Sequence, residues 1–102
     1  MNNEIIQFYN RVLCTVRQVT GQKDFLHTNR EEAVDARTIL ILLLSEKGLS
    51  DKEISIITGL TRQGVNKLKN SARFRIKKWS FHSDLQQIRN ELATDNFSSN
   101  AL

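Results

Sequence analysis

The stretch Leu49–Leu68 reads Leu-Ser-Asp-Lys-Glu-Ile-Ser-Ile-Ile-Thr-Gly-Leu-Thr-Arg-Gln-Gly-Val-Asn-Lys-Leu, the pattern of a short helix, a glycine turn and a second helix. Counted from Asp51, the fifth residue is small (Ser55) and the ninth is glycine (Gly59). The fifteenth is β-branched (Val65). A small residue lets two helices cross closely, glycine permits a positive φ in a tight turn, and a branched residue fills the inner face of the second helix. These steric requirements predict a helix-turn-helix.

Two capping signals set the boundaries of the motif helices. Ser50 is followed three residues later by Glu53, which is the capping-box pattern and predicts a helix over 51–58. Thr61 is expected to cap the second motif helix, because a threonine hydroxyl accepts well from the free amides of a first turn. The whole motif is therefore expected over about 50–73.

Apolar residues recur at helical spacing on the N-terminal side of the motif. They predict an amphipathic helix over 4–19, ended by Gly21, and another helix over about 30–47, ended by Gly48. The second half of that helix, Ile39–Leu44, is apolar nearly all round. We therefore expect it to be the central helix of the core.

The segment between these two helices should contribute to the core and to a helix cap. Phe25 and Leu26 are expected to be core residues, and Thr28 or Asn29 is expected to cap the second helix. The chain contains no proline, and no hairpin turn pair is present. The expected fold class is all-α, a small bundle of four to five helices that contains the helix-turn-helix.

Directly after the motif, the spacing of apolar residues is compatible with two structures. The second motif helix is expected to run to about Trp79, because inward apolar positions continue at helical spacing through Val65, Leu68, Ala72, Ile76 and Trp79. The alternation over 74–77 also allows a short strand. Trp79 and Phe81 are expected in the core, the alternative being a stacking surface for RNA or single-stranded DNA.

A last helix is expected near the C-terminal end. Ser83 with Gln86 forms another capping box, which predicts a helix from there to about Ala93. Residues 1–93 are therefore expected to form one domain, followed by a polar tail over 94–102.

Size and composition argue against an enzyme. A chain of 102 residues is too short for a catalytic domain plus a regulatory one, and it has neither a phosphate-binding glycine loop nor a nucleophile motif. The single Cys14 with only His27 and His82 gives no zinc ligand set. The longest apolar run, Ile39–Leu44, is far shorter than the roughly 20 residues that span a bilayer. We expect a cytoplasmic protein without cofactor, metal, small-molecule substrate or membrane contact.

The positive charge is concentrated within and just after the second motif helix. The chain has a net charge of +4, and seven lysines and arginines fall in residues 62–78 without one acid. Such a block is usually only a solvated face. Its coincidence with a helix-turn-helix favours double-stranded DNA as the partner.

In a helix-turn-helix, the outward side chains at the start of the second helix read base edges in the major groove. Arginine bonds guanine, glutamine and asparagine bond adenine, and the threonine methyl contacts thymine. The outward residues here are Thr61, Arg62, Gln63, Asn66, Lys67 and Asn70. Phosphate contacts are expected from Lys67, Lys52, Arg73 and Arg30, with Arg37 as a further candidate.

Gly64 has two interpretations. It is the third residue of the second motif helix, where glycine costs about 1 kcal/mol relative to alanine. Either the missing side chain lets DNA approach the backbone closely, or it makes room for the neighbouring helix.

The stretch from Ile5 to about Ile76 resembles the C-terminal DNA-binding domain of the bacterial replication initiator DnaA. The resemblance rests on these elements in order: Gly21, Asp24-Phe25-Leu26, Arg30, Val34-Asp35-Ala36-Arg37, Leu49-Ser50, Glu53-Ile54 and Gly59. It implies that Arg30 lies in a loop at the DNA backbone or minor groove, and that the helix from Thr61 enters the major groove.

The recognition segment differs from that family. The family signature is glycine-glycine-arginine-aspartate-histidine-threonine-threonine-valine, whereas this chain has Gly59-Leu60-Thr61-Arg62-Gln63-Gly64-Val65. The resemblance therefore implies the scaffold of the initiator domain with a different DNA site. It suggests a small transcriptional regulator or a regulator of plasmid maintenance or replication.

The chief alternative is a protein-interaction module that uses the 83–93 helix as a dimer or partner surface. Leu85, Ile88 and Leu92 lie on one side of that helix. If they are exposed, a symmetric homodimer that reads two half-sites is expected. If they fold back onto the core, no apolar side remains on this helix to recruit a partner.

Overall fold

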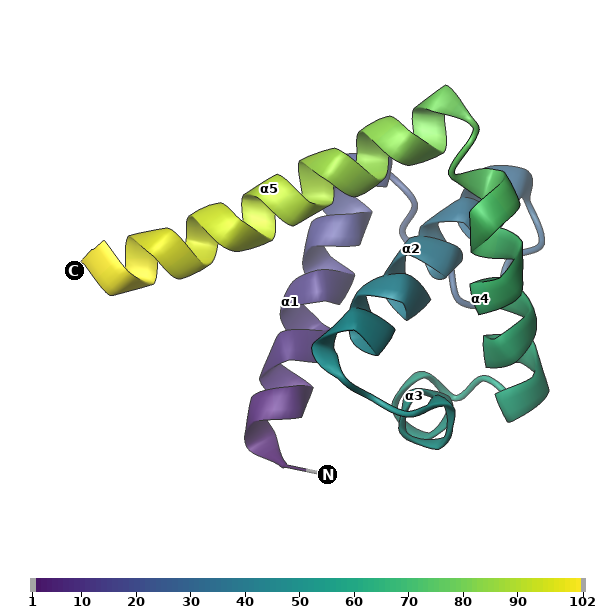
Figure 1. The fold of residues 1–102 in the computed structure, drawn as a ribbon, viewed down its shortest axis with the longest axis horizontal. Helices are drawn as coiled ribbons and strands as arrows, with labels where there is room; N and C mark the ends of the chain where they lie inside the picture. The colour runs from purple at the N-terminus through teal and green to yellow at the C-terminus, as the bar shows by residue number, and fades with distance from the viewer. Residues whose placement is uncertain (1, 102) are drawn as a thin grey trace.

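Five helices follow one another in the computed structural model, which describes residues 2–101 of the backbone and residues 2–94 of the side chains (Figure 1). No strand occurs in that part of the chain, so the short strand allowed over 74–77 is absent. The helices are α1 (Asn3–Thr20), α2 (Glu31–Lys47), α3 (Asp51–Thr58), α4 (Arg62–Arg75) and α5 (Trp79–Ala101). The protein is a small all-α bundle, as the sequence predicts.

Helix α2 is the centre of the bundle. It contacts α1, α3 and α4, and α5 packs on α1 (Figure 1). Its side chains are buried nearly all round, with Ile39, Leu40 and Ile41 fully inaccessible to solvent. This burial confirms the prediction that the apolar run is the central element. It also gives α4 a rigid apolar surface to pack on through Val65, which is itself fully buried.

Helix α5 packs on α1. Its residues Leu85, Ile88 and Leu92 are buried in the same core as α1 and α2. The Arg11 guanidinium of α1 donates to the Leu92 carbonyl at 3.3 Å, and Arg89 pairs with Glu46 of α2. The apolar side of α5 is therefore used within the chain.

Helix α3 begins and ends where the sequence predicts, and α4 begins directly after its predicted cap, Thr61. The Ser50 amide donates to Glu53 Oε1 at 2.9 Å, and the Glu53 amide donates to Ser50 Oγ at 3.2 Å, which completes the capping box. Gly59 has a φ of +80°, so the left-handed turn between α3 and α4 favours glycine. The Ser55 hydroxyl donates to the Leu60 carbonyl at 2.5 Å and fixes that turn.

The start of α2 is not capped as expected. Neither Thr28 nor Asn29 is its N-cap: the residue in that position is Arg30, and its side chain makes no capping hydrogen bond. The Thr28 hydroxyl donates instead to the Asp24 carbonyl at 2.8 Å. That bond closes a turn within the loop, so the hydroxyl is not available to the helix.

The prediction that α4 continues to Trp79 is wrong. The helix ends at Arg75, a turn follows, and α5 begins at Trp79, four residues before the capping box expected at Ser83. The turn lets Phe81 enter the core, where it is 1% exposed. Core burial of Phe81 therefore outweighs the local helical pattern.

Because of this turn, some apolar side chains that the sequence predicts to be buried are exposed to solvent. Trp79 is 80% exposed and Ile76 is 40% exposed, so both predictions of core positions are wrong. Cys14 is also exposed, although it adjoins the apolar stripe of α1. The α5 backbone continues to Ala101, beyond the end expected near Ala93, whereas the side chains of the predicted polar tail from residue 95 onward lie outside the described residues.

A charged cluster ties the α4–α5 turn to the start of α2. Arg75 and Lys78 each contact Asp35 at 2.7 Å, and both also pair with Glu31. The hydrogen bond and charge of Lys78, followed by the charge of Arg75, lower the pKa of Glu31. A further acid in this region, Asp84, has its pKa raised, first by burial and then by the charge of Asp35.

Replacing Asp84 with asparagine should stabilise the protein at neutral pH. Since folding raises the pKa of Asp84, its ionised form is less favourable in the folded chain than in the unfolded chain. The stability contributed by this group therefore falls as pH rises from the ordinary value of 3.8 through the raised pKa. Because the side chain is only partly buried, we expect a rise in Tm of only about 1–3 °C at pH 7.

That gain should disappear in thermal melts below the ordinary pKa of aspartate, where both variants are neutral. The exposed Glu32→Gln is the charge-matched control and should not reproduce the pH-dependent gain. A lower Tm for Asp84→Asn than for the parent protein at pH 7 would contradict the argument.

Candidate nucleic-acid interface

The start of α4 and the start of α3 together form an open hollow on the surface. Four of the residues predicted to contact DNA line it, all of them from α4. They are Arg62, Gln63, Asn66 and Lys67. The structure therefore brings together the side chains that the sequence selected as outward residues of one helical face.

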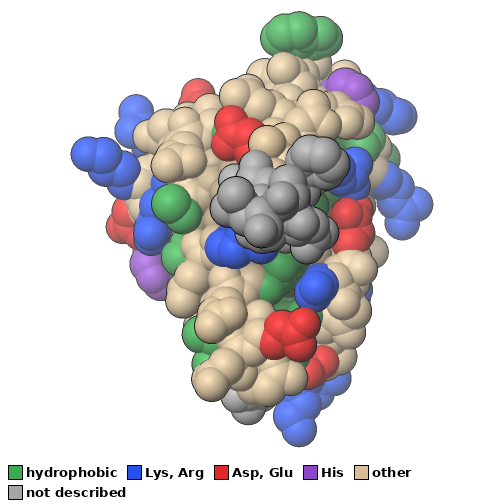
Figure 2. All heavy atoms as spheres, turned by 90° about the vertical axis from the view of Figure 1, so that its left-hand side faces the viewer, with side chains coloured by type: hydrophobic (Ala, Val, Ile, Leu, Met, Phe, Trp, Pro, Cys, Tyr) green, Lys and Arg blue, Asp and Glu red, His purple; other side chains and the backbone are tan. Residues whose placement is uncertain are grey.

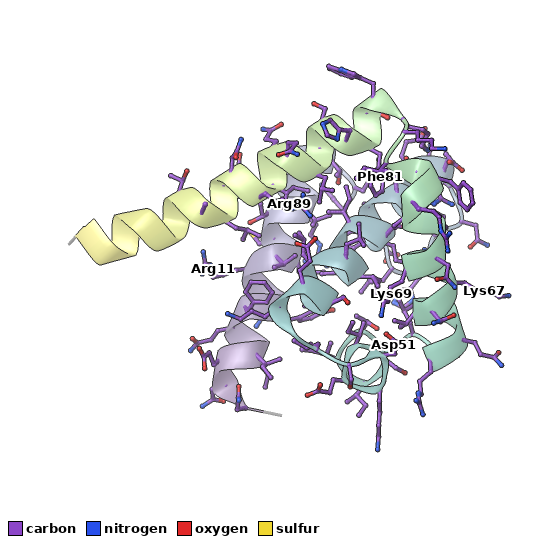
Figure 3. All side chains as sticks on the ribbon, in the orientation of Figure 1. Arg11, Asp51, Lys67, Lys69, Phe81 and Arg89 are labelled. Atoms are coloured by element: carbon purple, nitrogen blue, oxygen red, sulfur yellow. The ribbon has the colours of Figure 1, made fainter. Side chains whose placement is uncertain are left out.

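The geometry of this face follows from the cap that precedes it. The Thr61 hydroxyl accepts the Gly64 amide at 2.9 Å and fixes the first turn of α4. With Val65 buried and Leu68 packed against the core, Gln63, Asn66 and Lys67 are left on the exposed side. Figure 3 shows Lys67 extending from α4 away from the body of the protein.

Two asparagines on this face are already linked to each other. Asn70 Nδ2 donates to Asn66 Oδ1 at 3.1 Å. This bond directs the Asn66 amide nitrogen away from Asn70, so a donor group of Asn66 faces the hollow. Arg62 and Lys67 have no ion-pair partner among the described side chains, and both are exposed.

Asp51 also lines this hollow, and the sequence analysis did not select it. Its carboxylate accepts from Lys69 Nζ at 2.8 Å, so the first residue of α3 is bonded to the middle of α4. Figure 3 shows Asp51 and Lys69 between these two helices. The cap at Ser50 predicts that Asp51 begins α3, but the place of Asp51 in the hollow depends on how α3 crosses α4, which no local pattern reveals.

The remaining predicted phosphate contacts do not line the hollow. Lys52 is exposed on the first turn of α3, and Arg30 is exposed at the N-cap of α2. Arg73 is exposed near the end of α4, where its guanidinium lies 5.8 Å from the Phe74 ring centroid. Lys52 directly follows Asp51 beside the hollow, whereas Arg73 lies in the last turn of α4, and Arg30 precedes Glu31, which pairs with Arg75 at that same end of α4. The three cations therefore do not form one cluster.

Arg37 has a structural role that the sequence did not predict. Its guanidinium donates to the carbonyls of Phe25, at 2.9 Å, and Thr28, at 2.5 Å. These bonds hold the loop before α2. Burial lowers the pKa of Arg37, an effect that the charge of Asp24 opposes.

The basic block over 62–78 is divided by the fold. Lys69, Arg75 and Lys78 are each bonded to an acid, whereas Arg62 and Lys67 are not. The acids lie on α2 and α3, so this division depends on tertiary contacts. On the opposite side of the protein, which Figure 2 shows, lysine and arginine side chains are also interspersed with acidic ones. The exposed face of α4 is thus the part of the block that remains available to a partner.

Gly64 is not needed to make room for the neighbouring helix, whereas its role in letting DNA approach the backbone stays a prediction. A Cβ built at this position would lie 3.0 Å from Thr61 Oγ1, so the close neighbour is the cap of its own helix. That distance is tight but involves a side chain that can rotate. Gly64 also borders a second, more apolar hollow on α4, formed with Leu60 and Leu68. Lys67 borders both hollows.

Replacing Gly64 with alanine should stabilise the fold by up to about 1 kcal/mol, the intrinsic advantage of alanine over glycine inside a helix. A small displacement of the Thr61 hydroxyl is enough to admit the new methyl group. Chemical denaturation measures the change, and Thr61→Ala, which removes the cap, is expected to cost about 1 kcal/mol. If Gly64→Ala is as destabilising as Thr61→Ala, the methyl group has broken the cap and the expectation is wrong.

The two aromatic residues after α4 do not form a stacking surface. Phe81 is buried, as expected, and Trp79 is exposed. Binding of RNA or single strands by stacking was expected to need both rings at the surface. The aromatic pair therefore gives this alternative no support.

Comparison with known proteins gives no further constraint. No protein family, curated protein or solved structure matches the chain. None of the helices in the described part of the chain combines the length and apolar character needed to cross a bilayer. The function must therefore be argued from the side chains of the hollow on α3 and α4.

Proposed function

We propose that this protein binds double-stranded DNA, with α3 and α4 as the two helices of a helix-turn-helix. The observation that carries the proposal is the hollow at the start of α4, which is lined by Arg62, Gln63, Asn66 and Lys67. Base edges in the major groove are recognised by these side-chain types. In a helix-turn-helix, base contacts come from the N-terminal part of the second helix, and these four residues occupy the first two turns of α4.

The proposed roles follow from chemistry and position. Arg62 is suited to bidentate bonding of guanine, and Gln63 and Asn66 are suited to adenine. Thr61 and Asn70 border this set at either end. Lys67, Lys52, Arg73 and Arg30 are proposed to contact phosphates, because they are exposed cations.

The biological role that suits such a domain is regulation. The resemblance to the initiator domain supports a small cytoplasmic regulator of transcription, or of plasmid maintenance or replication. The altered recognition segment supports a DNA site different from that of the initiator. No catalysed reaction and no cofactor is proposed.

The alternative of a protein-interaction module is less well supported. Its surface was expected to include Leu85, Ile88 and Leu92, and these side chains are buried within the chain. A homodimer that reads two half-sites would need another contact surface. We therefore propose duplex DNA as the partner. The number of protein copies that bind one duplex is to be measured.

The test is duplex binding by fluorescence anisotropy over a salt series, with 20-base-pair duplexes of random sequence and then duplexes selected from that pool. We expect binding at low salt with a log–log salt slope of about −0.9 per phosphate neutralised. Enrichment of one sequence family would identify the site. No binding at low salt would refute the proposal, and equal binding of single strands would refute duplex recognition.

A further inference from the structure

A carboxylate lies inside the surface proposed to meet DNA, where a polyanion would be expected to disfavour it. Asp51 lines the hollow together with Arg62, Gln63, Asn66 and Lys67. Its side chain retains 27% of its accessibility, so it is neither buried away from a ligand nor free in solvent. Any role proposed for Asp51 must explain why a negative charge lies in this hollow.

Asp51 interacts with three residues of α4. Lys69 Nζ lies 2.8 Å from its carboxylate and itself retains 33% of its accessibility. The pKa of Asp51 is lowered first by the hydrogen bond and charge of Lys69, and then by the Asn66 amide and the charge of Arg62. Since Asn66 Oδ1 is occupied by Asn70, the Asn66 amide nitrogen is the group left to face Asp51. Asp51 therefore links the start of α3 to residues on two successive turns of the reading face.

We infer that Asp51 is a specificity-determining residue that makes the hollow select base edges over phosphates. It attracts the side chains of Arg62 and Asn66 to one wall of the hollow, and it neutralises Lys69, which would otherwise attract the DNA backbone. The inference rests on the proposed function and goes beyond it, because it assigns specificity to a residue of the first motif helix.

The chemistry of a carboxylate explains how this selection works. An ionised carboxylate is only an acceptor, so it repels a phosphate oxygen but can accept from an exocyclic amino group of cytosine or adenine. A duplex that places an amino group beside Asp51 is favoured, and a phosphate in the same place is disfavoured. Unlike charge attraction, this effect distinguishes sequences.

The test compares Asp51→Asn with Glu53→Gln. Both changes remove one negative charge from α3, and glutamine at position 53 still completes a capping box. Each variant is titrated with the random duplex pool and with the best duplex selected by the unmodified protein. For Asp51→Asn we expect binding to the random pool to tighten about threefold or more, with a salt slope steeper by about 0.9 because Lys69 is released.

The decisive readout is the ratio of the affinities for the selected and the random duplexes. Asp51→Asn should lower this ratio about tenfold, within the range that one base contact contributes. Glu53→Gln should leave it unchanged. An unchanged ratio for Asp51→Asn, or an equal fall for both variants, would overturn the inference, and thermal melts check that both proteins are folded.

Arg62→Ala separates this inference from the proposed function. If Arg62→Ala weakens binding of the selected duplex while Asp51→Asn leaves the ratio unchanged, the inference alone is wrong. If Arg62→Ala has no effect on any duplex, the proposed interface is wrong and the role of Asp51 is overturned with it.

Discussion

Replacing Ile88 with alanine should lower the free energy of unfolding by about 2–5 kcal/mol. Ile88 is fully inaccessible to solvent in the core cluster that joins α5 to α1 and α2. The substitution removes buried methyl groups and leaves a cavity, which surrounding side chains fill only in part. In a domain of this size, the loss corresponds to a fall in Tm of at least about 8 °C, measured by circular dichroism.

The exposed Gln87→Ala is the matched control on the same helix, and it should change stability by less than about 0.5 kcal/mol. The pair of variants also decides between an internal and an external role for α5. If this helix were a partner surface, Ile88→Ala would change association and leave the stability of the monomer intact. A Tm within 2 °C or so of the parent protein would contradict the packing described above.

Replacing Arg62 and Lys67 together with alanine should weaken binding of the selected duplex by about 10²-fold or more. A bidentate arginine contact to guanine contributes about 1–3 kcal/mol of discrimination, which is about 5- to 150-fold. The lysine contributes through phosphate, so its loss should reduce the magnitude of the salt slope by about 0.9. Anisotropy titrations at three or more salt concentrations separate the two effects.

The matched control is Lys23→Ala, which removes an exposed positive charge from the loop between α1 and α2. It should leave the affinity within about twofold at physiological salt, because screening over about 8 Å weakens distant charges. Arg62 and Lys67 are themselves exposed, so the double variant should unfold at nearly the same temperature as the parent protein. Equal losses for the double variant and for Lys23→Ala would mean that binding follows net charge and not the proposed interface.

The boundaries of the first four helices could be predicted where local chemistry marks them. Gly21, Gly48 and Gly59 all have positive φ and end their helices, and the hydroxyls of Ser50 and Thr61 cap the next ones. Each of these signals acts within a few residues, so it can be recognised without the fold. The sequence also predicts the central helix, because a run that is apolar nearly all round has to be buried.

The α4–α5 turn could not be predicted in the same way. Neither glycine nor proline marks it, and the apolar spacing continues through Ile76 to Trp79. Its position depends on two distant interactions: Phe81 enters the core, and Arg75 pairs with the acids of α2. Asp35, which pairs with Arg75, lies 40 residues away in the chain, so a local sequence pattern carries no information about this contact.

In the candidate site, too, some residues could be predicted from local patterns and others could not. Helical periodicity was sufficient to select Arg62, Gln63, Asn66 and Lys67, because it only has to separate outward from inward positions. It could not reveal Asp51, whose place in the hollow depends on how α3 crosses α4. The charge available to a partner also depends on which cations the acids of α2 and α3 neutralise.

The internal pairing of Lys69, Arg75 and Lys78 has a consequence for how long such a protein stays on non-target DNA. If all seven cations of residues 62–78 faced a duplex, they would release counterions with a salt slope of about −6.3, and any sequence would retain the protein strongly. With three of them held by acids, the block contributes a slope of about −3.6 at most. The protein would then leave random sequence quickly in the cell, and the time spent at each position would depend mainly on the bases.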